Sequence, residues 1–329
     1  MGAKECVKTK KPGSKRVSRR SEFFVTILAI FVLVGSLCFG IGLFIYKQNY
    51  PEPETSNTEP EQEDENLDSG TPQDPETTEK EIVLVDFQPA IDDWVKTING
   101  NKSILIYDLN LDKPVGSYNL KENYNTASLY KLFVVYEGYK RISKGIWNGE
   151  DKAGSTGKTI SKCLDLAIRE SHSPCAETLW GMIGRDSLDN LMAKEWGITG
   201  SDISKLTSNV SDIALIMKRF YEHPDFDDVN LLTAMWDSFL NQPNTQYEWR
   251  QGLPRGFSKA SVYNKVGWDY NAEKKYWNIY HDAAIVKFPM KDGTTRDFVV
   301  VVMTNKVDFK DIRKFGTMIE NKFYEKMEI

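Results

Sequence analysis

The sequence predicts an α/β domain of the α+β type, in which a five-stranded antiparallel sheet is built from both ends of the domain and an all-helical lobe lies between them. Three observations predict this fold. Two strand-like segments lie near the beginning, within residues 103–120. Apolar residues at helical spacing fill residues 129–240, and three more strand-like segments lie within residues 261–303.

The first elements expected are a helix over residues 90–98 and a β-hairpin. Residues 103–109 and 114–120 read as its strands, because runs rich in aliphatic and aromatic residues flank the turn Asn110-Leu-Asp-Lys113. The hairpin supplies the first two strands of the sheet.

The middle of the domain is predicted to be helical. Its apolar residues recur at about 3.6-residue spacing, which places them on one face of a helix. The helices expected from this pattern cover residues 129–142, 160–168, 176–183, 188–196, 210–221 and 229–240. Together they would form the helical lobe.

The last elements return to the sheet. Residues 261–266, 280–288 and 297–303 are rich in Val, Ile and aromatics and are separated by turn residues such as Lys291-Asp-Gly293. A closing helix follows, with one apolar stripe made by Phe309, Ile312, Ile319, Phe323 and Met327. Residues 83–329 therefore fit one domain, because a single core stops growing only beyond about 250–300 residues.

A membrane-spanning helix is expected from Phe23 to Tyr46, which has 24 residues and no charge. At about 1.5 Å per residue it is long enough for the roughly 30 Å hydrocarbon core. The apolar run ends without a small-x-small cleavage site, so we expect an uncleaved signal-anchor. The alternative is a lipid attached to Cys38, but Leu37 stands where a small residue is expected.

The flanks of this helix predict its orientation. Residues 1–22 form a basic tail, with eight Lys and Arg against one Glu in the first 20 residues, and such tails stay cytoplasmic. Residues 47–82 form an acidic linker: from Tyr50 to Glu81 there are five Pro and twelve acidic residues, too little apolar surface to order a chain. The domain at 83–329 would then lie outside the cytoplasm.

The net charge of −5 conceals this division, because tail and linker contribute opposite signs. It implies no nucleic-acid partner. The basic tail has a topological role in this interpretation, and an anionic-lipid or nucleic-acid site there is the alternative.

The sequence favours a nucleophile that is not activated by His. The three His residues, His172, His223 and His281, lack the paired spacing of zinc ligands, so neither a metal nor another cofactor is expected. No Gly-x-Ser-x-Gly elbow is present, although a Ser-His-Asp triad is geometric and stays open.

Ser128-Leu-Tyr-Lys131 offers another route. Residues three apart share a face of a helix, so the Lys131 amine is within reach of the Ser128 hydroxyl, and a desolvated Lys can serve as a base. Ser128 would sit at the amino terminus of an apolar helix, where backbone N–H groups favour negative charge. The alternative is that Ser128 caps the helix and Lys131 is solvated.

Two further motifs follow in order. Ser171-His-Ser173 lies between two predicted helices, and Lys265-Val-Gly267-Trp268 closes a predicted strand. With Ser128-x-x-Lys131, this order on these elements resembles the class A β-lactamases and the related penicillin-binding proteins and D-alanyl-D-alanine carboxypeptidases. The resemblance covers most of residues 83–329.

The resemblance implies a role for each matched residue. Ser128 would be the nucleophile, Lys131 its base, Ser171 a proton relay, and Lys265 the positive charge for a substrate carboxylate. The oxyanion hole would use the backbone N–H groups of Ser128 and Trp268. Ser173, Val266 and Gly267 would complete the substrate-binding set.

Three departures from the family pattern point to altered turnover. Ser173 replaces an Asn, and Val266 replaces a hydroxyl residue that would bond the substrate carboxylate. The segment from Gly197 to Leu206 lacks the Glu-x-x-Leu-Asn pattern whose Glu activates the deacylating water. Glu195 and Asp202 are nearby carboxylates, which we interpret as solvated helix or turn residues.

The remaining residues around the motifs admit simpler readings. Cys163 and Cys175 lie 12 residues apart on successive predicted helices and would pair outside the cytoplasm or stay as separate buried thiols. His172 reads as an exposed loop residue. The hairpin aromatics Trp268, Tyr270, Trp277 and Tyr280 are expected to pair across strands rather than line a groove.

Two functions fit these observations. The first is a monomeric, membrane-anchored serine hydrolase or acyltransferase that forms an acyl-enzyme with β-lactams or peptidoglycan-type D-alanyl peptides. The second is a ligand-binding or sensor domain of the same fold with slow or absent turnover. A third, purely structural role requires a cleft that keeps Lys131 and Lys265 away from Ser128.

Overall fold

The computed structural model describes residues 82–242 and 250–327. The predicted basic tail, membrane helix and nearly all of the linker lie outside these ranges. No helix within them is both long enough and apolar enough to cross a bilayer.

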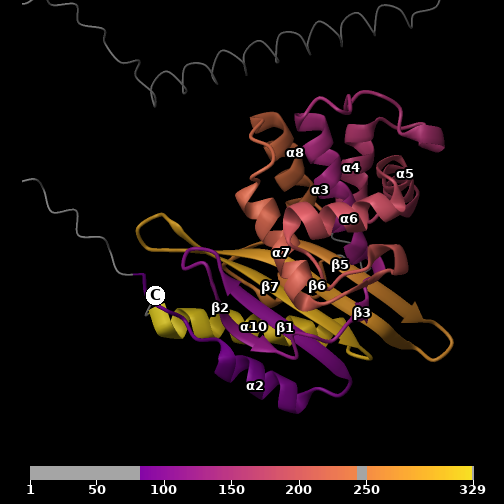
Figure 1. Cartoon of the computed structure of the whole chain (residues 1–329). Coiled ribbons are helices and arrows are strands. Elements are labelled where there is room, and N and C mark those ends of the chain that lie inside the picture. Colours follow the sequence, from indigo (N-terminus) through magenta and orange to yellow (C-terminus); the bar gives the residue numbers. More distant parts are fainter. Residues whose placement is uncertain (1–81, 243–249, 328–329) are drawn as a thin grey trace, which may run out of the picture. The chain divides into compact units, whose positions relative to one another are not determined.

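The domain is organised around one antiparallel sheet in the order β2-β1-β7-β6-β5 (Figure 1). The strands are β1 (Asn101–Asp108), β2 (Lys113–Tyr118), β5 (Ser261–Asn271), β6 (Tyr276–Pro289) and β7 (Thr295–Asn305). β1, from the beginning of the domain, pairs with β7 from its end, with Ile104 opposite Val302. The predicted five-stranded sheet, assembled from both ends of the domain, is confirmed.

The central strand β7 shows why the sheet is covered on both faces. Its residues from Phe298 to Met303 form a continuous apolar run, and all of them are buried. Side chains alternate along a strand, so Val299 and Val301 pack into the helical lobe while Val300 and Val302 pack toward the opposite face.

The two longer helices on one face of the sheet are α2 (Gln88–Thr97) and α10 (Phe309–Met327) (Figure 1). Trp94 of α2 packs on Phe315 of α10 with ring centroids 5.0 Å apart. Phe323 of α10 stacks on Phe288 of β6 at 4.0 Å. The apolar stripe predicted for the closing helix therefore faces the sheet.

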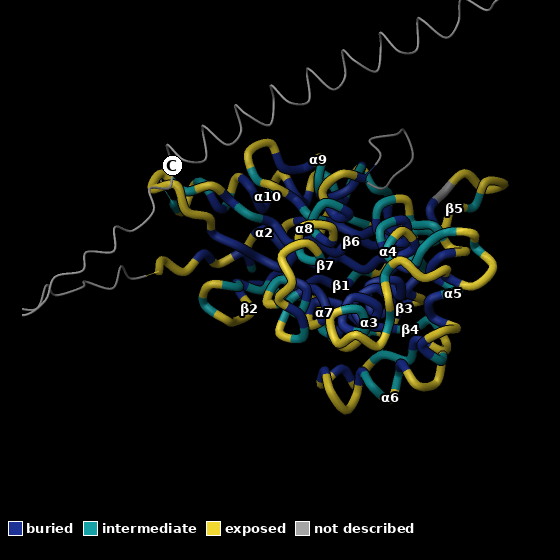
Figure 2. The backbone as a smooth tube through the Cα atoms, turned by 90° about the horizontal axis from the view of Figure 1, so that it is seen from above, coloured by how far each residue is buried: buried dark blue, intermediate teal, exposed yellow. Residues whose placement is uncertain are grey.

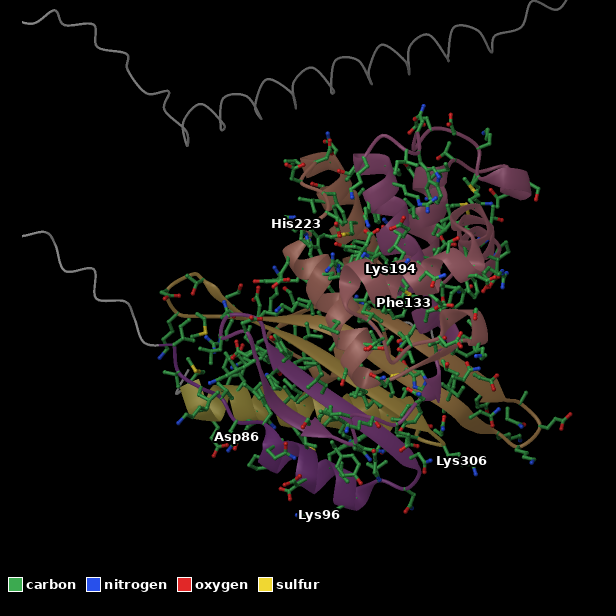
Figure 3. The ribbon with its side chains drawn as sticks, in the orientation of Figure 1. Asp86, Lys96, Phe133, Lys194, His223 and Lys306 are labelled. Carbon is green, nitrogen blue, oxygen red and sulfur yellow. A yellow bond between two sulfur atoms is a disulfide. The ribbon has the colours of Figure 1, made fainter. Side chains whose placement is uncertain are left out.

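Six helices form the lobe on the other face, as predicted (Figure 1). They are α3 (Tyr130–Ser143), α4 (Ile160–Arg169), α5 (Ser173–Ile183), α6 (Arg185–Trp196), α7 (Val210–Glu222) and α8 (Val229–Leu240). α3 is buried on every side from Tyr130 to Lys140, as expected of a central helix. Figure 2 shows it in dark blue, and Figure 3 places Phe133 inside the lobe.

Several boundaries differ from the prediction. α5 begins at Ser173 rather than at residue 176, because Pro174 fits the first turn of a helix, where no N–H is needed. β5 runs past residue 266 to Asn271, so Gly267 does not end it.

Some short elements have no counterpart in the prediction. They are the small sheet of β3 (Tyr124–Asn125) and β4 (Thr207–Ser208), the 3-10 helices η1 (Ala127–Leu129), η2 (Gly154–Thr156) and η3 (Ile203–Lys205), and the helix α9 (Leu253–Gly256). Elements of two to four residues are too short to show a hydrophobic period.

Candidate active site

Ser128 lies in η1, the 3-10 turn that leads into α3, and its side chain is half-buried. α3 itself begins at Tyr130, one residue later than the helix predicted over residues 129–142. Ala127, just before Ser128, has φ 43°, and its N–H donates to Asn125 Oδ1 at 2.8 Å. Such sparsely populated conformations cost free energy and cluster at functional sites.

Lys131, on the first turn of α3, is fully buried next to Ser128. Its Nζ donates to Ser128 Oγ at 3.1 Å and to Ser173 Oγ at 3.1 Å, and the backbone O of Ser171 also accepts. Burial lowers the pKa of Lys131 to about 8, because the charged form is poorly solvated there. The alternative of a solvated Lys131 is therefore wrong.

Ser171 joins this lysine to a second one. It lies between α4 and α5 in a left-handed conformation with φ 52°. Its Oγ is 3.2 Å from Lys131 Nζ and 3.0 Å from Lys265 Nζ. Burial, and then repulsion by Lys131, lowers the pKa of the fully buried Lys265 well below its usual value. Ser128, Lys131, Ser171 and Lys265 thus form one continuous chain of contacts.

Gly267 brings β5 against the turn that carries Ser128. A Cβ at this position would lie 2.5 Å from the backbone O of Thr126 and 3.1 Å from the backbone N of Leu129. A larger residue would force strand and turn apart, so the third motif needs glycine for close packing of two backbones.

The side chains of Val266 and Trp268 lie on the other face of the sheet. Val266 is fully buried in the cluster beneath α10, and only its backbone O contacts Lys265 Nζ, at 2.7 Å. Trp268 packs edge-to-face on Trp277 at 5.6 Å, and Tyr270 packs on Trp277 at 4.8 Å. The hairpin aromatics therefore pair with each other, as expected.

His281 is a site residue that the sequence did not single out. The backbone N–H of Thr304 donates to its Nδ1 at 2.9 Å, so Nε2 carries the proton and donates to the backbone O of Asn125 at 2.8 Å. Burial lowers the pKa of His281 to about 4, which keeps it neutral. This hydrogen bond anchors Asn125 of β3, three residues before Ser128. Its only sequence signal is a lone His in an apolar strand.

Cys163 and Cys175 form a disulfide between α4 and α5. Both are fully buried. The backbone N–H of Cys175 donates to Nδ1 of His172 at 3.2 Å, so His172 caps α5 instead of extending freely into solvent. The bridge and the cap brace the loop that holds Ser171.

Glu195 and Asp202, the carboxylates near the segment from Gly197 to Leu206, make local contacts. Asp202 caps η3 and accepts from Ser204 Oγ at 2.6 Å and from the N–H of Lys205 at 3.1 Å. Glu195 forms an ion pair with Lys140. These contacts agree with the interpretation of both residues as helix or turn carboxylates.

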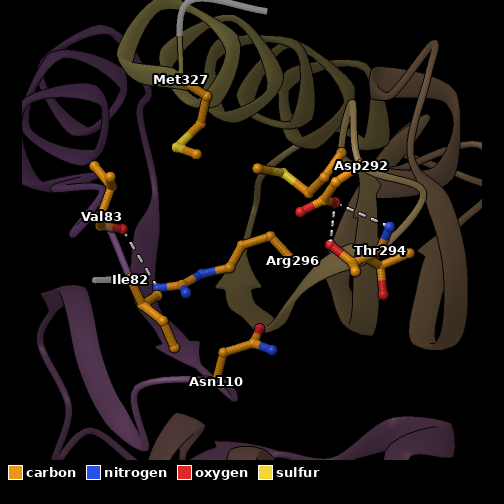
Figure 4. A pocket seen from close by; sticks show the side chains of 9 residues that line it. Ile82, Val83, Asn110, Asp292, Thr294, Arg296 and Met327 are labelled. Atoms are coloured by element: carbon orange, nitrogen blue, oxygen red, sulfur yellow. Dashed lines mark hydrogen bonds between the residues drawn. The ribbon is translucent and has the colours of Figure 1, made fainter. Parts of the chain in front are cut away.

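The described ranges contain no metal site, and they contain a pocket that lies apart from this cluster. No group of three or more His, Cys, Asp or Glu residues there is arranged to hold a metal ion. A pocket of about 440 Å³ lies beside the end of α10, and none of the predicted site residues lines it (Figure 4). Arg296 lines this pocket and donates to the carbonyl of Val83 at 3.5 Å.

Solved structures share this fold. A β-lactamase from Xanthomonas campestris pv. campestris str. ATCC 33913 has 11% identity and a TM-score of 0.60, covering 73% of this chain and 100% of its own. A class A β-lactamase from Bacteroides cellulosilyticus DSM 14838 has 14% identity and a TM-score of 0.59, with 72% and 96% covered. An ancestral (GNCA) class A β-lactamase has 13% identity and a TM-score of 0.59, covering 72% of this chain and 99% of its own. At such identities the likeness shows the fold alone.

The fold is that of the β-lactamase-like serine hydrolases. A model of the β-lactamase enzyme family matches residues 86–323, so the chain belongs to this family. Among curated proteins, none matches the sequence.

Proposed function

We propose that this protein is a membrane-anchored, extracytoplasmic serine acyl-enzyme that reacts with β-lactams or with peptidoglycan-type D-alanyl peptides. One observation carries the proposal: the buried amine of Lys131 lies 3.1 Å from the hydroxyl of half-buried Ser128. Burial lowers the pKa of Lys131 to about 8. A lysine in that environment can release its proton near neutral pH and act as a base.

The reaction follows from the contacts. Neutral Lys131 takes the proton of Ser128, whose Oγ attacks the amide carbonyl carbon of the substrate. The backbone N–H groups of Ser128 and Trp268 stabilise the oxyanion. Ser171 passes a proton from Lys131 to the leaving nitrogen as the C–N bond breaks, and water or an amine then releases the acyl group.

Substrate binding draws on the residues around this chain of contacts. Lys265 in its protonated form would hold a substrate carboxylate, and its contact with Ser171 Oγ supports the relay. Ser173 presents a hydroxyl beside Lys131. Gly267 keeps β5 close to η1, and Val266 contributes its backbone only, because its side chain is buried on the far face.

The proposed location rests on the sequence. The helix from Phe23 to Tyr46, with a basic tail before it and an acidic linker after it, would hold a monomeric domain outside the cytoplasm. Protease treatment of intact cells tests this topology, because only an external domain would be cleaved.

Labelling with a fluorescent penicillin tests the activity. The full chain, purified in mild detergent, should acquire a covalent label that peptide mapping assigns to Ser128, and the Ser128→Ala variant should acquire none. Equal labelling of both proteins, or no label on the wild-type chain over a range of pH, would contradict the proposal.

A second candidate is a domain that is acylated once and stays so. Asp202, the carboxylate of the segment that replaces the glutamate loop, is held within its own turn. A steady-state hydrolysis rate well above that of Ser128→Ala would exclude this candidate.

A further inference from the structure

Glu177 is a carboxylate close to the lysine base that neither the motifs nor the family pattern assigns. It lies on α5, four residues after Ser173, so the two share a helical face one turn apart. Ser173 Oγ is 3.1 Å from Lys131 Nζ. The face of α5 that touches Lys131 therefore continues directly to Glu177.

Tyr130 connects Glu177 to the site. Its hydroxyl donates to Glu177 Oε1 at 2.7 Å, and Lys131 Nζ lies 5.7 Å from the centre of its ring. Burial, and then the neighbouring Glu177, raises the pKa of Tyr130, so the phenol stays protonated and holds the carboxylate in place. Tyr130 thus fixes the position of a negative charge near Lys131.

Arg185 on α6 binds the same carboxylate. Its Nη2 donates to Glu177 Oε2, and its guanidinium stacks on Trp180 at 4.2 Å. The side chains of Arg185 and Glu177 are 54% and 41% exposed, so water screens this pair. Within the described ranges, the titratable groups that face Lys131, besides Tyr130, are therefore Lys265 on β5, Glu177 on α5 and, through Glu177, Arg185 on α6.

We propose that Glu177 is a positioning residue that sets the pH at which Lys131 becomes an effective base, and that Arg185 opposes it. The inference rests on the proposed function of Ser128. A negative charge favours the ammonium form of Lys131, which must lose its proton before it can activate Ser128. Arg185 offsets part of that charge.

The electrostatics of Lys131 agree in direction. Burial lowers the pKa of Lys131, and the charge of Glu177 is the opposing influence that raises it. Without Glu177, Lys131 would be neutral at lower pH. Without Arg185, the carboxylate would act more strongly and Lys131 would become neutral only at higher pH.

The test is the pH dependence of acylation. The second-order rate constant for acylation of Ser128 by a chromogenic β-lactam is measured from about pH 6 to pH 10 on the full chain and two variants. Glu177→Gln should move the acid limb of this pH–rate profile, where the rate constant rises as Lys131 loses its proton, to lower pH by about 0.3–1 unit. Arg185→Gln should move it up by a smaller amount, about 0.1–0.4 unit, because the pair is screened.

Two control variants separate charge from structure. Glu195→Gln also removes one carboxylate, but Glu195 pairs with Lys140 away from the cluster, so the limb should stay in place. Tyr130→Phe removes the hydrogen bond and keeps the charge, so it should move the limb less than Glu177→Gln does. A purely structural role for Glu177 would not give shifts of opposite sign in Glu177→Gln and Arg185→Gln.

Two results would overturn the inference: no shift of the limb in Glu177→Gln, even with a changed adduct lifetime, or a shift of the same sign in both variants. If the wild-type chain is not acylated at all, the proposed function fails instead. The inference then stands or falls on NMR titration of ¹³C-labelled lysine, which reports the same opposite shifts of Lys131 without any substrate.

Discussion

Neighbouring residues of β5 serve two different clusters on opposite faces of the sheet. Lys265 faces the helical lobe and contacts Ser171 Oγ. Asn264 faces the α9 and α10 side, where its Nδ2 donates to Asp282 Oδ1 at 2.9 Å, and the backbone N–H of Leu253 donates to Asp282 Oδ2 at 2.8 Å. One strand therefore holds a chain of serines and lysines on one side and a buried carboxylate on the other.

A shifted pKa does not tell the two clusters apart. Burial raises the pKa of Asp282 to about 7, and burial lowers that of Lys131 to about 8. The difference lies in access and in chemistry: Asp282 is fully buried, whereas Ser128 is half-buried and offers a nucleophile beside a base. Perturbed ionisation marks a site only where a reactive group can meet a substrate.

Both clusters depend on close approach of the backbone. A Cβ at Gly252 would lie 2.6 Å from Asp282 Oδ2, and one at Gly267 would lie 2.5 Å from the carbonyl O of Thr126. The first glycine lets a loop close over a carboxylate. The second lets β5 lie beside the turn that carries Ser128. Glycine therefore permits close backbone packing at both clusters.

The largest effect is expected from removing the base. Lys131→Met keeps the length of the side chain and removes the amine, so acylation of Ser128 at pH 8 should fall by about 10²–10⁴-fold. Stopped-flow acylation measures the loss, and circular dichroism should show an unchanged fold. A loss below tenfold in a folded variant would remove Lys131 from the mechanism.

A smaller effect on acylation is expected from the other face. Asp282→Asn places an amide N–H₂ against a donor, which should cost about 1–3 kcal/mol of stability while acylation changes by less than about threefold. The pKa of Asp282 is raised above its ordinary 3.8 to about 7, so the folded state binds more protons than the unfolded state between these values. Wild-type stability therefore falls as pH rises from about 4 to about 7.

Thermal unfolding at several pH values checks this second prediction. The gap in melting temperature between the wild-type protein and Asp282→Asn should narrow as pH rises through that window, because only the wild-type protein loses the contribution. If acylation in Asp282→Asn fell as far as in Lys131→Met, the two faces would form one functional unit and the contrast between them would be lost.

The fold was largely predictable because its signals are local. The valine run of β7 and the helical spacing of the lobe can be read within single elements. The contacts of Ser128 with Lys131 were predictable for the same reason, since they lie three residues apart on one turn. The order of the three motifs then indicated which other residues join them.

The remaining contacts of the site join residues far apart in the chain. His281 reaches Asn125 across 156 positions, and Tyr130 reaches Glu177 across 47. No periodicity links such pairs, because their proximity comes from how strand and helix pack. We also did not predict that the side chain of Val266 points away from the site. β5 runs past Gly267, and because side chains alternate along a strand, Val266 lies on the face opposite the helical lobe.

The proposed activation of Ser128 depends most on the proton affinity of Lys131, which NMR titration of ¹³C-labelled lysine measures directly. The signal assigned to Lys131 is the one that disappears in Lys131→Met. It should titrate near pH 8, well below ordinary lysines at about pH 10.4. If that signal titrated with the surface lysines instead, Lys131 would stay charged at neutral pH and would not be the base that activates Ser128.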